Sequence, residues 1–212
     1  MTFISGYKNL LSSESTWKRF IAIVLTFFFL FYSMVILSHL FLPEGILRGK
    51  NSGDLFDTST NIWISSLQIF FWNMISVVLL IVANLFANRR KETEPYISYG
   101  ILCMIAWAVI DGLTLGTNSF GIYRENTELP IKLLGTFDLA NRAGMWELVG
   151  LNCIASAFQQ KSLILSTKKV TITKKLSQLK FTGSDILFLV IGLILMIVGA
   201  IIESASIIKV IT

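Results

Sequence analysis

The chain has 212 residues, of which 54% are hydrophobic and 15% are charged, and its mean hydropathy is +0.70. This balance excludes a soluble domain and indicates an integral membrane protein. The connections between its apolar blocks are too short for a second domain of ordinary size, so we expect a single transmembrane domain over residues 1–212.

The first segment, residues 1–16, is predicted to be a short amphipathic helix lying in the cytoplasmic interface of the membrane. Its apolar residues recur at helical spacing around Lys8: Phe3, Ile4, Tyr7, Leu10 and Leu11. A frayed polar tail is the alternative.

Five apolar blocks follow, each long enough for the roughly 20 residues that a membrane-spanning helix needs: residues 18–42, 63–88, 96–118, 139–162 and 184–208. Barrel strands would alternate rather than run apolar, and lipid offers backbone groups no partners. The sequence therefore predicts an all-α, polytopic integral membrane bundle of about five transmembrane helices plus the N-terminal interfacial helix. The first block is too long for a signal peptide and no small-residue cleavage site follows it, so we expect it to be retained.

The +5 net charge indicates orientation, because positively charged loops stay on the cytoplasmic side. Basic residues gather before the first block, between the second and third, and between the fourth and fifth. We therefore expect a multi-pass protein of the cell membrane with a cytoplasmic N-terminus and an extracellular C-terminus. The cytoplasmic residues expected to contact a partner chain are Arg89, Arg90, Lys91, Lys168, Lys169, Lys174 and Lys175. The lysines among them also suit anionic lipid headgroups, or they act only as a topology anchor.

Polar side chains inside the apolar blocks form the candidate functional site, since lipid does not require them. They are Asn73, Asp111, Asn118, Glu147 and Glu203, with Arg142 as the candidate counter-ion. At 1.5 Å per residue, Asp111 lies about 20 Å from the cytoplasmic end of its block, and the acids gather in the outer half of the bundle. The carboxylates either pin helices together, handle a substrate or protons, or contact another subunit.

Glycines in the same apolar blocks as these polar residues are expected to let the helices approach each other closely. They are Gly112, Gly116, Gly144, Gly192 and Gly199. Cys103 and Cys153 lie inside apolar blocks without metal-ligand spacing, which favours packing over a disulfide or metal role. We expect no metal, no cofactor and no nucleic-acid partner. Soluble-enzyme motifs such as GxxxxGK[ST], HExxH and GxSxG are absent, and no GxGD-like motif surrounds Asp111 to support an intramembrane aspartyl pair with Glu147, so we expect a non-enzymatic protein.

The order of the polar motifs resembles the stage II sporulation protein M family of bacterial and archaeal membrane proteins. An Asn in the second block (FWNMIS, Asn73) is followed by a glycine-rich third block and an Asn-containing turn (DGLTLGTNSFG, Asp111 to Gly121). A Gly-x-x-Glu motif (AGMWELVGLNCIASA, Gly144 and Glu147) and a late Glu (GAIIES, Glu203) complete the set, which covers roughly residues 69–204. The family commonly has His-Gly before the Glu, whereas Ala143 stands here, and the charged segment 123–141 makes a longer connection than expected.

The resemblance implies a membrane partner of an ABC-type ATPase or of cell-wall hydrolases. We therefore expect a permease-like subunit of an export complex, for a peptide or lipid-like substrate, working as a homo-oligomer or heteromer with a separate ATPase. The alternative is a non-transporting scaffold for envelope or cell-wall remodelling proteins.

Overall fold

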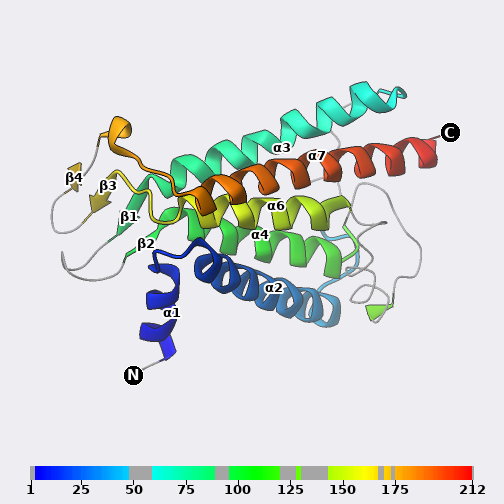
Figure 1. The fold of residues 1–212 in the computed structure, drawn as a ribbon. Coiled ribbons are helices and arrows are strands. Elements are labelled where there is room, and N and C mark those ends of the chain that lie inside the picture. Colours follow the sequence, from blue (N-terminus) through cyan, green and yellow to red (C-terminus); the bar gives the residue numbers. More distant parts are fainter. Residues whose placement is uncertain are drawn as a thin grey trace.

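The chain forms a bundle of long helices with a small β-sheet at one end, seen in a computed structural model (Figure 1). The structure describes residues 3–47, 59–88, 96–119, 128–129, 143–166, 170–172 and 175–211. We call the end of the bundle beside the sheet the sheet end and the opposite end the far end. The N-terminus lies near the sheet end and the C-terminus at the far end (Figure 1).

Four helices are long and apolar enough to cross a membrane: α2 (Thr16–Phe41), α3 (Ile62–Asn84), α4 (Tyr99–Gly116) and α7 (Gly183–Ile211), the last within residues 183–208. Their outer faces carry exposed large apolar side chains such as Phe29 (73% exposed), Trp63 (70%) and Phe71 (66%). Apolar surface of this extent would drive association in water. Lipid is its natural solvent, so the structure is that of a helical membrane protein.

The described part of the fifth predicted block, 139–162, contains helix α6 (Ala143–Phe158), which ends four residues before the block does, and residues 139–142 lie outside the described residues. The helix has 16 residues, or about 24 Å at 1.5 Å per residue, against a hydrocarbon core of about 30 Å. It lies at the centre of the bundle, where it contacts each of the other four long helices. Residues 152–157 are all at most 2% exposed. Protein rather than lipid therefore surrounds the second half of this helix.

The sheet has the strand order β2-β1-β3-β4, with β1 (Phe86–Asn88), β2 (Ile97–Ser98), β3 (Ile164–Ser166) and β4 (Val170–Ile172). Strands β1 and β3 pair in parallel, and the other two pairings are antiparallel. The parallel orientation of β1 and β3 follows from the helices, because α3 and α6 both run toward the sheet end and lead into β1 and β3, respectively (Figure 1). A short 3₁₀ turn, Leu176–Gln178, precedes α7.

The sheet corrects two of the predicted block boundaries. The second block, 63–88, contains a helix that ends at Asn84, and the third, 96–118, contains one that begins at Tyr99. Their remaining apolar residues form β1 and β2 instead. The first and last blocks, 18–42 and 184–208, match α2 and α7 closely, since α2 begins at Thr16 and α7 at Gly183.

Helix α1 (Phe3–Leu11) falls inside the segment predicted to be an interfacial helix. Its Leu11 is fully buried and Tyr7 packs against the same apolar core, which otherwise comes from the long helices. The helix extends away from the long axis of the bundle at the sheet end (Figure 1). Its position in a membrane interface stays a prediction.

Glycines bring two pairs of helices into close contact. A Cβ atom at Gly112 would lie 2.6 Å from the Phe31 carbonyl oxygen, and one at Gly116 would lie 2.5 Å from that of Val35, so α4 sits directly on α2. A Cβ at Gly150 would meet the Gly192 carbonyl at 2.8 Å, where α6 meets α7.

Gly144, predicted to have a packing role, makes no close contact with the described residues, since a Cβ there would meet none of them within 4 Å. Gly144 lies near the start of α6, before that helix reaches its tightest contact with α7. Gly199 is buried in α7. Gly150, which the sequence pattern did not single out, makes the contact on α6.

Candidate functional site

The centre of the candidate site is a hydrogen bond between α3 and α6. Asn73 Nδ2 donates to Glu147 Oε1 over 2.6 Å. Glu147 lies one turn after the start of α6, in the half of the bundle away from the sheet. An amide facing a carboxylate in an apolar setting ties the two helices together, because neither group finds another partner in lipid.

Two further carboxylates lie near this pair. Asp111 of α4 and Glu203 of α7 are both close enough to Glu147 for their charges to interact with it. Neither has a hydrogen-bond or ion-pair partner among the described residues, and all three acids are partly buried. Three carboxylates and one amide from four helices therefore converge in the far half of the bundle. We call Asn73, Asp111, Glu147 and Glu203 the acid cluster.

The acid cluster does not form a metal site among the described residues. Across the described ranges, no three His, Cys, Asp or Glu side chains are placed to hold a metal ion. Its chemistry is that of like charges held near one another in an apolar setting, an arrangement that favours a bound proton or an approaching cationic group.

One residue predicted for this site, Asn118, makes its contacts elsewhere in the structure. Asn118 ends α4 with a left-handed backbone (φ 51°) and donates from Nδ2 to Glu44 Oε1 over 2.7 Å. The neighbouring turn is closed by the Gly45 N–H, which donates to the Thr117 carbonyl over 2.7 Å. Asn118 thus links α4 to the segment after α2. Its left-handed backbone leaves the helix, so its side chain does not lie on the helix face that carries Asp111. Arg142, the expected counter-ion, lies outside the described residues.

A second buried charged group, which the sequence did not reveal, lies at the sheet end. Arg19 of α2 and Asp185 of α7 form an ion pair of 2.7 Å with side chains that are 2% and 1% exposed. Arg19 also donates to the carbonyls of Ser156 (2.8 Å), Ser13 (2.7 Å) and Glu14 (3.0 Å). Its hydrogen bonds join the N-terminal segment, α2, α6 and α7.

Asp185 is fully satisfied by its neighbours. Lys161 Nζ lies 2.7 Å from its second oxygen, and Thr16 Oγ1 donates to its first over 2.7 Å. Thr182 and Asp185 also exchange hydrogen bonds between side chain and backbone, at 2.9 and 3.2 Å, which is a capping box at the start of α7. The Thr-x-x-Asp spacing before an apolar run was the sequence signal for this cap.

A polar network of amides and hydroxyls lies beside the sheet. The Ser98 hydroxyl contacts both the Asn84 and the Gln159 side-chain amides, and all three residues are fully buried. A hydroxyl has one proton, so it donates to Asn84 and accepts from Gln159 when the latter presents its NH₂. Asn84 also donates to the Leu80 carbonyl over 2.9 Å, and Ser162 donates to the Asn84 carbonyl over 2.8 Å. The network joins the ends of α3 and α6 to the start of α4.

Most of the basic residues predicted to contact a partner lie outside the described residues: Arg89, Arg90, Lys91, Lys168, Lys169 and Lys174. Lys175 is described and exposed, and its backbone N–H donates to the Gln178 side chain over 2.9 Å. It lies in the segment between β4 and α7, beside the sheet.

The fold and these buried polar groups define a helical membrane protein in which, among the described residues, four helices long and apolar enough to cross a membrane pack around α6. No family model, no curated protein and no solved structure matches this chain.

Proposed function

We propose that this chain is a permease-like membrane subunit of an export complex, for a peptide or lipid-like substrate, and that it works with a separate ABC-type ATPase. The single observation that carries the proposal is the acid cluster. In its described surroundings, three carboxylates have one amide as their only hydrogen-bond partner.

The Arg19–Asp185 group shows how the same fold satisfies a carboxylate that has a structural role. Asp185 has two cations, a hydroxyl and a backbone N–H around it. An intramembrane acid without such partners is costly, by about 2.5–3.5 kcal/mol at the bilayer centre. Holding three such acids near one another is therefore better explained by a role in handling protons or a cationic group than by helix packing alone.

The ATPase assignment rests on the resemblance to the stage II sporulation protein M family. The chain has no phosphate-binding loop motif of its own, which fits an ATPase on a separate chain. We propose that the sheet end is cytoplasmic. The basic residues proposed to contact that chain are Arg89, Arg90, Lys91, Lys168, Lys169, Lys174 and Lys175. The resemblance to the stage II sporulation protein M family supports the same arrangement, and it too is a proposal.

Purification of the tagged chain from its native membrane in a mild detergent tests this function. A stoichiometric ABC ATPase among the co-purifying proteins is the expected result. Recovery of cell-wall hydrolases, or of the chain alone, contradicts the export proposal.

A second candidate function, a non-transporting scaffold for envelope or cell-wall remodelling proteins, is favoured by the glycine contacts. Helix α4 touches the backbone of α2, and α6 touches that of α7, which leaves no room for a channel between either pair. A substrate path would then run between subunits in an oligomer. Glu147→Gln separates the two functions, because export depends on the carboxylate and a scaffold does not.

A further inference from the structure

Helix α3 lies at one side of the bundle (Figure 1) and is the least buried of the four helices that could cross a membrane. Only 17% of its most apolar stretch is buried, against 28–44% in the other three. Its exposed face carries a run of residues at alternating intervals of four and three, which is the heptad spacing of helices that pack side by side. The residues of this run, which we call the α3 seam, are all exposed: Ile64, Gln68, Phe71, Ile75, Val78 and Val82.

One member of the α3 seam is polar. Gln68 lies six residues after the start of α3, about 9 Å along the helix axis. Since α3 has 23 residues and is about 34 Å long, Gln68 falls inside a hydrocarbon core of about 30 Å centred on the helix. In the described spans of α2, α4 and α7, no exposed residue within 21–41, 102–110 or 186–205 carries an amide or a charge. Gln68 therefore differs from the rest of the lipid-facing surface.

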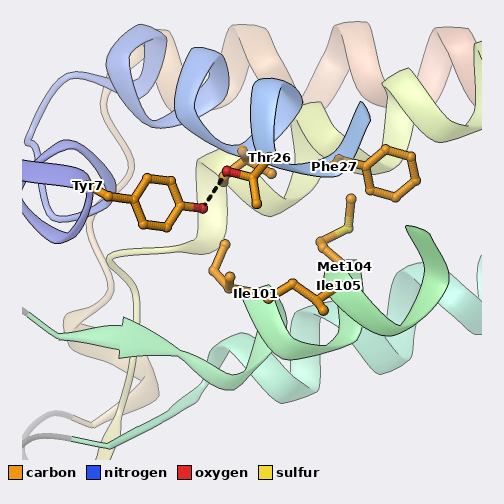
Figure 2. Close-up of a pocket in the computed structure, with 7 residues that line it drawn as sticks. Tyr7, Thr26, Phe27, Ile101, Met104 and Ile105 are labelled. Atoms are coloured by element: carbon orange, nitrogen blue, oxygen red, sulfur yellow. Dashed lines mark hydrogen bonds between the residues drawn. The ribbon is translucent and has the colours of Figure 1, made fainter. Parts of the chain in front are cut away.

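The hydrogen bonds of Gln68 are incomplete within the chain. By contrast, the Thr26 hydroxyl of α2 lies 2.8 Å from that of Tyr7, which reaches it from α1 (Figure 2). The side-chain oxygen of Gln68 accepts from the Ser59 N–H over 3.3 Å, but its NH₂ group has no partner among the described residues. An amide donor that faces lipid is costly unless another helix supplies an acceptor.

We propose that a second copy of this chain packs against α3 along the α3 seam, with the two Gln68 amides hydrogen-bonded to each other. Copies in one membrane share the same orientation, so a two-fold axis along the membrane normal brings each seam residue beside its own counterpart. An amide is both donor and acceptor, and its oxygen has a second lone pair besides the one that Ser59 uses. Gln68 therefore complements itself, and a single polar residue in an apolar seam fixes the register of two helices. This inference needs membrane insertion but not export.

Disulfide cross-linking of the full chain in its native membrane tests the contact, because a disulfide forms only when two Cα atoms come within about 7 Å. Phe71→Cys and Ile75→Cys place thiols on the α3 seam. Leu25→Cys is the matched control, because Leu25 of α2 is 65% exposed and lies, like Ile75, about 14 Å from the sheet end of its helix. After oxidation, we expect severalfold more covalent dimer from the two seam variants than from Leu25→Cys. Wild type, which has free Cys103 and Cys153, gives the background.

The amide pair is tested in the chain that carries Ile75→Cys. Adding Gln68→Leu is expected to reduce the cross-linked fraction severalfold, because it removes the donor and the acceptor, whereas Gln68→Asn keeps an amide and is expected to retain most of it. Equal cross-linking in the seam variants and in Leu25→Cys, or an unchanged fraction after Gln68→Leu, would overturn the proposal. The export proposal is tested separately, by the Glu147→Gln variant.

Discussion

Arg19 and Asp185 are 166 residues apart in the chain and form a buried ion pair of 2.7 Å. The pair joins the first and last spanning helices at the sheet end. Burying two charges is costly, and the pair is stable only because Lys161, Thr16 and several backbone carbonyls complete its hydrogen bonds. The contact between the first and last spanning helices at the sheet end therefore depends on a buried ion pair whose two side chains both have further hydrogen-bond partners.

Asp185→Asn is expected to destabilise the protein strongly, because Arg19 and Lys161 lose their shared counter-charge. Removing one partner of a buried ion pair costs about 3–5 kcal/mol. The measurement is the unfolding transition of the purified protein in detergent, followed by circular dichroism. Lys18→Met is the control, since Lys18 is the exposed neighbour of Arg19. A shift in Asp185→Asn no larger than that of the control would mean that the pair contributes nothing to closure.

Gly150→Ala is expected to separate α6 from α7, because the new Cβ would lie 2.8 Å from the Gly192 carbonyl. Neither backbone can yield without moving a helix, so we expect a loss of about 1–3 kcal/mol. Gly144→Ala is the control on the same helix. Its Cβ meets nothing within 4 Å, and alanine favours the helix by up to about 1 kcal/mol. Equal effects of the two changes on the unfolding transition would contradict the close contact.

The spanning helices were the part of the fold most open to prediction from sequence. Helices α2 and α7 begin within two residues of the expected blocks, since long apolar runs have few alternatives in lipid. The strands were missed because Phe86, Ile97 and their neighbours continue the apolar runs of α3 and α4. Helix α6 ends at Phe158, four residues before the predicted end of its block, because hydropathy does not distinguish burial in protein from burial in lipid.

The candidate site was only partly predictable. Helical periodicity predicted which helix faces carry Asn73 and Glu147. The contact between these two side chains depends on which helices are neighbours in the bundle, and a local sequence pattern does not contain that information. Arg19 was counted only as a cytoplasmic charge. Its burial depends on Asp185, at the other end of the chain, and the capping box at Asp185 predicts a helix start but not an ion pair.

Ser98→Ala is expected to leave two fully buried amides, Asn84 and Gln159, without their shared hydroxyl. An unsatisfied buried polar group costs about 1–3 kcal/mol, and the loss should appear as a lower midpoint of thermal unfolding. Ser33→Ala is the control, because Ser33 is not buried and its hydroxyl donates only to the Phe29 carbonyl one turn back. A midpoint for Ser98→Ala that matches the control would show that the network is dispensable.

Glu147→Gln is expected to fold like wild type and to lose export. The glutamine side-chain oxygen still accepts from Asn73 Nδ2, so the 2.6 Å link between α3 and α6 is kept, while the charge beside Asp111 and Glu203 is removed. Glu147→Ala removes the acceptor as well, and the unpaired Asn73 should then lower stability by about 1–3 kcal/mol. The two measurements are the unfolding transition and the export of the substrate from whole cells. Glu14→Gln, an exposed acid at the sheet end, should change neither. Full export by Glu147→Gln would contradict the proposed role of the carboxylate, because the hydrogen bond to Asn73 would then be sufficient without the charge.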